Sequence, residues 1–425
     1  MDVNRRTVLK GGAAVGALGW TGAAIHRDAD ADVARSADWG DQDEPADLDG
    51  YETHYVSQAG DGFDSIQEAV NEASAGDLVL IEPGIYDEAV ENHDTPRLTI
   101  RGLDRNEVLI DGEFERYNGI LITADDVVVE NLTVRNHNGN GVYWTNVEGY
   151  RGSYLTAYNN VEYGIYAFSA RYGRFEHCYA SGSDDAGYYI GESQPADAVI
   201  TDCIAENNAM GYSGTNAGGN LVIRDSLWRN NMTGIVPNTL DSQQGAPQGH
   251  VAGGIRIENN EIHDNNNLNA PAYELAYPLF GNGITIAGGT KNDVVGNHIY
   301  NQEKYGIAVT PLIDEQFYRP TDNAIMHNTI EDSGRVDVAL AAPASSNEFS
   351  DNDASSFRPV FLERRSGSIG DVWVLLQLFK DYLQADLTGN YHRGEVPDQP
   401  APDDQPNMAD PADAPPAEPV GGRYA

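Results

Sequence analysis

Cysteine is almost absent from this chain of 425 residues, which contains two cysteines and five methionines. So few sulfur atoms exclude a disulfide-dense scaffold and argue against a copper or zinc centre with sulfur ligands. Cys178 and Cys203 hold equivalent positions in the repeat described below, so we expect them to stack on neighbouring turns. That spacing is near disulfide range, but parallel neighbours rarely meet the geometry of the bond. We predict two buried free thiols, with a disulfide as the alternative.

Positive charge is also scarce. The chain has 26 Lys and Arg residues, only four of them lysines, against 66 Asp and Glu residues, which gives a formal net charge of −40. Such a charge repels nucleic acids and anionic membranes and excludes them as partners. The acids are spread through the chain rather than gathered in one tail. This distribution is typical of the solvation that halophiles use at high salt, where screening removes the self-repulsion.

Long hydrophobic runs are missing as well. No segment after the N-terminus approaches the ~18 apolar residues of a transmembrane helix. Residues 1–25 combine Arg5-Arg6 with a short apolar run and small residues, which predicts a signal peptide of the twin-arginine type. A short buried helix is the alternative. Residues 26–50 are acidic and poor in apolar residues, so we predict an unfolded linker. The protein is expected outside the cell or on its surface.

What the sequence does contain is a repeat of about 23 residues. Glycine followed by an apolar or aromatic residue recurs at Gly141, Gly164, Gly187, Gly211 and Gly234, and again at Gly283 and Gly306. A second anchor precedes each glycine: Asn136, Asn159, Gly182, Asn207 and Asn230, continued by Asn265, Gln302 and Ser333. Around the anchors lie strand-like triplets bounded by Asn, Asp and Gly. One unit cannot bury a face alone, so stacked units must pair their strands in parallel sheets around one core.

Over residues 51–360 these repeated segments resemble the right-handed parallel β-helix superfamily, which includes pectate lyases, polygalacturonases, alginate epimerases and NosD-like proteins. With the acidic composition, the chain resembles an exported haloarchaeal member. The resemblance implies an all-β solenoid with an N-terminal capping helix. Residues 65–90 fit this cap, because Ile66, Ala69, Val70 and Ala73 share one helical face ahead of an apolar strand.

A second helix is predicted in residues 361–392, where Val372, Leu375, Leu376, Leu378 and Phe379 have helical spacing. We expect it to cover the C-terminal opening of the solenoid, and a dimerisation helix is the alternative. The remaining residues 393–425 are rich in proline and aspartate, so we predict an unfolded tail.

The register of the repeat brings distant residues together. One and three places after each glycine the residues are mainly apolar and must face the core, so the intervening column faces outward. This column contains Tyr143, Tyr166 and Tyr189, which predicts an external ladder of tyrosines. Glu162 and Asp185 occupy one neighbouring column, and Asp184 lies beside it. Glu192 and Asn216 belong to a further column at the end of the strand.

Aromatic rings bordered by carboxylates and amides suit a polysaccharide, whose C–H faces pack on rings while its hydroxyls need polar partners. The alternative is that the stacked rings only stiffen the sheet. Asp184, Asp185 and Glu162 are the catalytic candidates, because paired acids can transfer protons in glycoside hydrolysis. Asp184 and Asp185 are also candidate ligands for Ca²⁺, which prefers oxygen. The third interpretation is that these acids only solvate the surface.

The resemblance does not decide the reaction. Asp184-Asp185 matches one polygalacturonase motif, but residues 249–258 (GHVAGGIRIE) lack the second glycine and the lysine of two others. A lyase or epimerase needs a base beside the acids, and Tyr189 and His177 are weak candidates, while Lys304 lies several coils away. The insertion at 235–282 is a second place for binding residues. Its polar members include Asn238, Asp241 and His263, which we predict to contact substrate.

The sequence therefore predicts a secreted β-helix that binds polysaccharide, with lyase, epimerase or hydrolase activity on acidic chains as one interpretation. A non-catalytic, NosD-like or cell-surface platform is the other.

Overall fold

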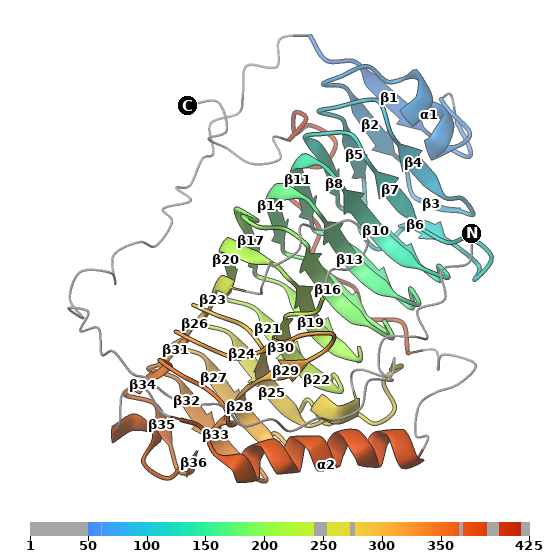
Figure 1. Ribbon diagram of the computed structural model, residues 1–425. Helices are drawn as coiled ribbons and strands as arrows, with labels where there is room; N and C mark the ends of the chain where they lie inside the picture. The colour runs from blue at the N-terminus through green and yellow to red at the C-terminus, as the bar shows by residue number, and fades with distance from the viewer. Residues whose placement is uncertain are drawn as a thin grey trace.

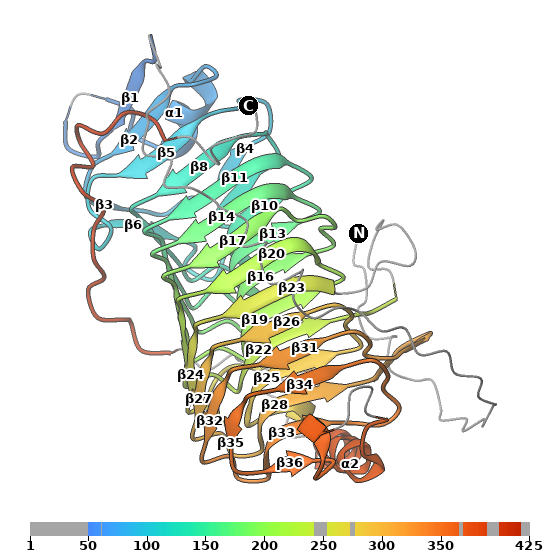
Figure 2. The same ribbon diagram turned by 90° about the vertical axis from the view of Figure 1, so that its left-hand side faces the viewer.

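The computed structural model describes residues 50–60, 62–241, 253–272, 277–364, 369–388 and 399–417. In this part of the chain short strands stack into three long parallel sheets that enclose one core, as Figures 1 and 2 show. The predicted parallel β-helix is confirmed. The predicted signal peptide, and all of the predicted linker except Gly50, lie outside the described residues.

Each coil contributes one strand to each sheet, in the order sheet C, sheet A, sheet B. Sheet A consists of β1 (Thr53–Val56), β2 (Leu78–Ile81), β5 (Thr99–Gly102), β8 (Val127–Glu130), β11 (Glu148–Ser153), β14 (Arg171–Glu176), β17 (Ala198–Thr201), β20 (Gly218–Arg224), β23 (Gly253–Glu258), β26 (Asp293–Val295), β31 (Ala324–Met326) and β34 (Glu348–Ser350). Sheet B consists of β3 (Gly84–Tyr86), β6 (Val108–Asp111), β9 (Thr133–Arg135), β12 (Thr156–Tyr158), β15 (Tyr179–Ser181), β18 (Ile204–Glu206), β21 (Leu227–Arg229), β24 (Glu261–His263), β27 (His298–Tyr300), β32 (Thr329–Glu331) and β35 (Asp353–Ala354).

Sheet C consists of β4 (Val90–Asn92), β7 (Ile120–Ile122), β10 (Asn140–Thr145), β13 (Tyr163–Phe168), β16 (Ala186–Gly191), β19 (Met210–Thr215), β22 (Thr233–Asn238), β25 (Asn282–Ala287), β28 (Tyr305–Thr310), β33 (Val336–Leu340) and β36 (Phe357–Arg358). A small antiparallel hairpin, β29 (Leu312–Ile313) and β30 (Phe317–Tyr318), projects after β28.

The predicted inward column forms the core. Val142 pairs with Ile165, and Ile165 with Tyr188, in successive parallel strands. The column continues through Tyr212, Ile235, Ile284 and Ile307, and every one of these side chains is fully buried. The first residues of these strands include a glycine because a larger side chain would clash with the next coil. A Cβ on Gly164 would come within 2.7 Å of the carbonyl oxygen of Gly187 on the next coil.

The asparagine anchor is two columns rather than the single column that the sequence indicated. Asn159 and Asn207 adopt left-handed backbone, with φ of 55° and 60°, and form the corner itself. The residue after the corner points inward, and on several coils it bonds to the next coil, as when the Asn208 backbone N donates to Asn231 Oδ1 at 3.0 Å. Asn265, Gln302 and Ser333 belong to this inner column. Assigning them to the corner column was an error of one residue.

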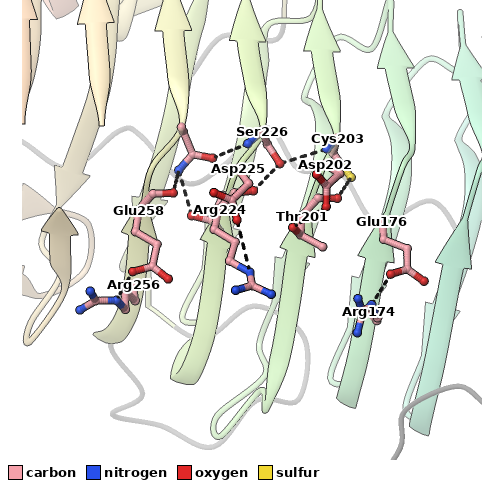
Figure 3. A network of polar contacts seen from close by, with 12 residues as sticks. Arg174, Glu176, Thr201, Asp202, Cys203, Arg224, Asp225, Ser226, Arg256 and Glu258 are labelled. Carbon is pink, nitrogen blue, oxygen red and sulfur yellow. Dashed lines mark hydrogen bonds and ion pairs between the residues drawn. The ribbon is translucent and has the colours of Figure 1, made fainter. Parts of the chain in front are cut away.

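Further amide ladders run at the other corners. The longest joins Asn260, Asn297, Asn328 and Asn352, in which each backbone N donates to the Oδ1 of the next residue at 3.0–3.2 Å. Cys178 and Cys203 occupy the corresponding positions on earlier coils, and both are buried free thiols as predicted. Figure 3 shows this part of the ladder, where the Cys203 backbone N donates to Ser226 Oγ at 3.0 Å. Buried polar groups at these corners are thus paired from coil to coil.

Both ends of the solenoid are covered. At the N-terminal end, helix α1 (Ile66–Glu72) buries Ile66, Ala69 and Val70 against the first coils, which confirms the predicted cap. At the other end, the 3₁₀ turn η3 (Leu362–Arg364) closes the core with Leu362. The Glu363 carboxylate ends the long ladder by accepting from the Asn352 backbone N at 3.0 Å.

The C-terminal helix is present as α2 (Val372–Thr388), but its predicted position is wrong. Instead of crossing the opening, it lies against the outer face of sheet C, where Val374 and Leu378 pack on Tyr305 and Ala308 of β28. The buried stripe therefore differs from the stripe read from the sequence. Val372 remains 59% exposed.

The prediction of an unfolded tail is also wrong for residues 399–417, which we call the strap. Thirteen hydrogen bonds join the strap to the described solenoid. Figure 2 shows the strap passing beside β3 and β6 toward β5. Two buried arginines anchor it: Arg101 donates to the carbonyl of Pro415 at 2.7 Å, and Arg105 to that of Pro406 at 3.1 Å.

Candidate functional site

The outer face of sheet C carries the predicted file of tyrosines. Tyr143 pairs with Tyr166, and Tyr166 with Tyr189, on the neighbouring strands β10, β13 and β16. The rings of Tyr143 and Tyr166 stack at a centroid distance of 4.3 Å and an angle of 7°, whereas Tyr166 and Tyr189 meet edge to face at 4.8 Å. The register read from the sequence therefore places these residues correctly.

Burial of this file differs from the expected exposed ladder. Tyr166 is 8% and Tyr189 4% exposed, and only Tyr143 is half-buried. The reason is a second apolar cluster outside the sheet, in which Met210, Met232 and Val236 continue the face, and Leu279 and Phe280 from the insertion pack on it. Tyr189 is thus a packing residue as well as a member of the file.

Tyr163 is a member of the site that the sequence reading missed. Its ring lies 4.4 Å from that of Tyr166 and 4.9 Å from that of Tyr189, and its hydroxyl donates to Asp185 Oδ2 at 2.8 Å. Burial, and then the nearby Asp185 carboxylate, raise the pKa of Tyr163 well above its usual value, so the phenol stays protonated at neutral pH. Its position directly before Gly164 in the repeat was the available signal. We call Tyr143, Tyr163, Tyr166 and Tyr189 the tyrosine cluster.

The three catalytic candidates border this cluster on consecutive coils. The Asp185 backbone N donates to the Glu162 carbonyl at 3.2 Å, and the Asp184 N donates to the Val161 carbonyl at 2.8 Å, so the two segments are neighbours. Glu162 accepts from the Tyr117 hydroxyl at 3.0 Å. All three carboxylates are partly exposed. Together with Tyr117 they form what we call the acidic rim.

The acidic rim and the tyrosine cluster both lie on the part of the chain that matches a family of known proteins. The family described as "Right handed beta helix region" matches residues 104–243 and 238–358, which together span more than half of the chain. The chain belongs to the right-handed β-helix family. No curated protein matches it.

Two solved structures illustrate what the chain is similar to. The mannuronan C-5 epimerase AlgE4 A-module of Azotobacter vinelandii is 14% identical, with a TM-score of 0.49, over 67% of this chain and 88% of that one. The alginate lyase of Paenibacillus sp. str. FPU-7 is 12% identical, with a TM-score of 0.47, over 72% of this chain and 98% of that one. At such identities a likeness concerns the fold alone.

Within this β-helix, Glu192 and Asn216 serve the corner that follows sheet C. Both have left-handed backbone, with φ of 50° and 54°, and the Asn216 amide donates to Glu192 Oε1 at 2.9 Å. Glu192 is 5% exposed. Glu192 and Asn216 therefore belong to a column of stacked turn residues. The sequence has one polar residue per coil at this position, which also indicates a turn.

The insertion residues separate into different places. Asn238 stays on sheet C, where its Oδ1 accepts from Thr215 Oγ1 at 2.8 Å. Asp241 instead anchors the β29–β30 hairpin by accepting from the Tyr318 hydroxyl and the Gln316 backbone N, both at 2.6 Å. Burial opposes ionisation, but these hydrogen bonds hold the pKa of Asp241 below its ordinary value.

His263 does not reach this face at all. It lies on sheet B, stacked on Tyr300 at 4.7 Å and bonded to Asp264 Oδ2 at 2.7 Å. The expectation that His177 lies near this face is wrong, because its ring lies 4.7 Å from that of Tyr154 at the corner between sheets A and B. Lys304, expected several coils away, pairs with Asp381 of α2 at 3.2 Å.

Asp184 and Asp185 are the predicted ligands for Ca²⁺. Among the residues that the structure describes, no three His, Cys, Asp or Glu side chains gather as a metal site. The candidate Ca²⁺ ligands of the rim therefore remain a prediction about two carboxylates.

Sheet A offers a contrasting surface, because its outward charges are already paired. Arg174 and Arg151 both bind Glu176, and Arg256 Nε lies 2.5 Å from Glu258 Oε2. Figure 3 shows the pairs of Arg174 with Glu176 and of Arg256 with Glu258 along the strands. Arginines that neutralise neighbouring acids leave little net charge for an anionic ligand. Sheet B also places rings beside acids, since the Tyr300 hydroxyl donates to Glu261 Oε1 at 2.8 Å, but the four mutually packed rings of the tyrosine cluster lie on sheet C.

Proposed function

We propose that the outer face of sheet C binds a polysaccharide that runs along the solenoid axis. The observation that carries the proposal is the tyrosine cluster with its acidic rim, in particular the Tyr163 hydroxyl on Asp185. Successive strands lie about 4.8 Å apart. A regular polymer can therefore repeat its contacts from coil to coil.

The chemistry of the face supports a sugar rather than a peptide or nucleic acid. Aromatic rings offer flat apolar surface for the C–H faces of a pyranose, and they combine it with polar edges. The carboxylates of Glu162, Asp184 and Asp185 accept hydrogen bonds from sugar hydroxyls, and bonds to charged acceptors are strong. Nucleic acid would be repelled by the acids.

The same acids favour a neutral chain over a polyuronate. A uronate carboxylate beside the rim would repel it unless a cation came between them. The proposal therefore includes a difference in ion dependence: neutral chains bind with or without divalent cations, and acidic chains bind only with them.

Binding, without turnover, is the function that the geometry supports best. His177 and Lys304 stand elsewhere, and the buried Tyr163 phenol is protonated, so it is a proton donor and not a base at neutral pH. Lyase, epimerase or hydrolase activity of Asp184, Asp185 and Glu162 remains a hypothesis. New reducing ends or unsaturated products from a polysaccharide panel would establish it, and their absence would leave a binding platform.

Tyr143→Ala is expected to weaken retention of the bound polysaccharide roughly tenfold, about 1.4 kcal/mol, because Tyr143 is the cluster ring with most solvent contact. Affinity electrophoresis in gels containing neutral or acidic polysaccharides, with and without EDTA, measures the effect. Tyr55→Ala is the matched control, since Tyr55 is 51% exposed on sheet A. Equal retention of the two variants and the unaltered protein would contradict the proposal.

We also propose that residues 1–25 direct export through a twin-arginine pathway and that 26–50 form a linker to the solenoid. Among the described helices, none has the length and apolar content to cross a membrane. Replacing Arg5 and Arg6 by lysine should keep the protein inside the cell. Unchanged secretion of that variant would remove the proposal.

A further inference from the structure

Helix α2 has two apolar faces, and only one of them is covered. Its inner face places Val374, Leu375 and Leu378 on the outer side of sheet C. On its outer face are apolar residues with large exposed fractions: Val372 59%, Trp373 39%, Leu376 56%, Phe379 49% and Leu383 39%. A surface helix of a monomer normally presents charged or polar residues there. Figure 1 shows α2 at the C-terminal end of the solenoid, with one long side turned away from the sheets.

The spacing of the exposed residues is that of a helix-pairing seam. Val372, Leu376, Phe379 and Leu383 follow one another by four, three and four residues. This is the alternation of the a and d positions of a heptad, which places side chains along one narrow stripe suited to another helix.

Charge on α2 is arranged so that acidic copies can meet there. Asp381 is turned inward and 7% exposed, where it is held by Lys304 at 3.2 Å and by Arg335 at 2.6 Å. The exposed Lys380 lies on the outer side, and the Arg358 guanidinium lies 5.0 Å from the centre of the Trp373 ring. In a chain of net charge −40, Asp381 is the one acid among the described side chains of α2, and it is paired, while Asp386 belongs to the last turn of the helix.

The apolar area is also of the size that a dimer requires. The five outer residues of α2 expose on the order of 500 Å², near the upper end for the largest patch of a monomer. Two such helix faces together would bury on the order of 1,000 Å², the size at which a specific interface begins. In the segment before α2, Val360, Phe361 and Ile369 are also 64%, 55% and 61% exposed.

We propose that this face pairs with the same face of a second copy of the chain. The two α2 helices lie antiparallel across a two-fold axis, so that Leu376 of one copy faces Phe379 of the other and Val372 faces Leu383. In such a two-fold interface the same surface of both copies is buried, so no surface remains for a third copy and the assembly stops at a dimer. The proposal is independent of the polysaccharide function, because α2 lies several coils away from the tyrosine cluster.

Sedimentation velocity of the full chain over a range of protein and salt concentrations tests the pairing. We expect a dimer whose dissociation constant falls as salt increases, since salt screens the repulsion between acidic copies and strengthens apolar contacts. The double variant Leu376→Glu and Phe379→Glu should raise the dissociation constant about a hundredfold or more. Ile313→Glu is the control, because Ile313 is 66% exposed on the β29 hairpin.

Circular dichroism melting separates dissociation from unfolding. The double variant should keep the far-ultraviolet spectrum, and its melting temperature should no longer rise with protein concentration. The proposal is overturned if the unaltered chain sediments as a monomer at all concentrations, or if the double variant still dimerises. Binding of the monomer to vesicles of neutral lipid through this face would also overturn it.

Discussion

Replacing Asn297 with alanine is expected to lower the free energy of unfolding by about 3–5 kcal/mol, because it removes the middle of a buried amide ladder. Asn297 is 1% exposed. Its Oδ1 accepts from the backbone N and the Nδ2 of Asn260, both at 3.0 Å, and its Nδ2 donates to Asn328 Oδ1 and the Ile257 carbonyl at 2.9 Å. Alanine leaves these groups buried without partners, and each costs about 1–3 kcal/mol.

Chemical denaturation followed by circular dichroism measures this loss. Asn71→Ala is the control: it removes an amide from the exposed face of helix α1, where Gln67 is its hydrogen-bond partner. We expect a change within about 0.5 kcal/mol for the control. If the two variants were equally stable, the ladder would not be the source of stability that the geometry indicates.

Arg105→Met is the second large effect, with an expected loss of about 4 kcal/mol. Arg105 is 1% exposed and links three coils to the strap. Its Nε donates to Thr156 Oγ1 at 2.8 Å, and its guanidinium donates to the carbonyls of Leu155 at 2.6 Å and His177 at 3.0 Å. Burial lowers the pKa of Arg105, yet an arginine in a protein stays charged. Hydrogen bonds to a charged group each contribute about 1.5–3 kcal/mol.

The same variant should loosen the strap. Amide exchange of residues 399–417 should become faster, because Arg105 holds the carbonyl of Pro406 and its own backbone N holds Asn407. Arg116→Met is the control, since Arg116 forms a partly exposed pair with Glu113 at 2.9 Å that is expected to contribute under about 1 kcal/mol. Unchanged exchange in the strap of Arg105→Met would show that the arginine is not its anchor.

Much of the solenoid could be predicted from the sequence, because the spacing of the repeated residues determines how the coils stack. A repeat of about 23 residues determines which side chains are neighbours between coils, so the core column from Val142 to Ile307 and the file from Tyr143 to Tyr189 could be placed from residue numbers. Spacing does not reveal what covers an outward column. Tyr189 is buried in an outer apolar cluster that contacts Tyr163 and Tyr166 and includes Phe280 from the insertion, where the repeat is interrupted.

The strap shows a different limit. Its proline- and aspartate-rich composition has no apolar periodicity, which is typical of unfolded segments. Its attachment depends on backbone carbonyls that accept from Arg101 and Arg105, and every residue type has such a carbonyl. The sequence feature that could have indicated this attachment is the presence of Arg101 and Arg105 on the first coils of an acidic chain. For α2, helical spacing was correctly recognised, but two apolar stripes shared the helix and the sequence did not indicate which one faced the sheet.

Hydroxyl-radical footprinting with and without bound polysaccharide tests the central claim most directly, because it reports the solvent contact of individual tyrosine rings. Tyr117 of the acidic rim is 57% exposed, Tyr143 is half-buried, and Tyr55 is 51% exposed on sheet A. The polysaccharide should slow oxidation of Tyr117 and Tyr143 and leave Tyr55 unchanged. Slower oxidation of Tyr55, with Tyr117 and Tyr143 unaffected, would place the sugar on another face and contradict the account.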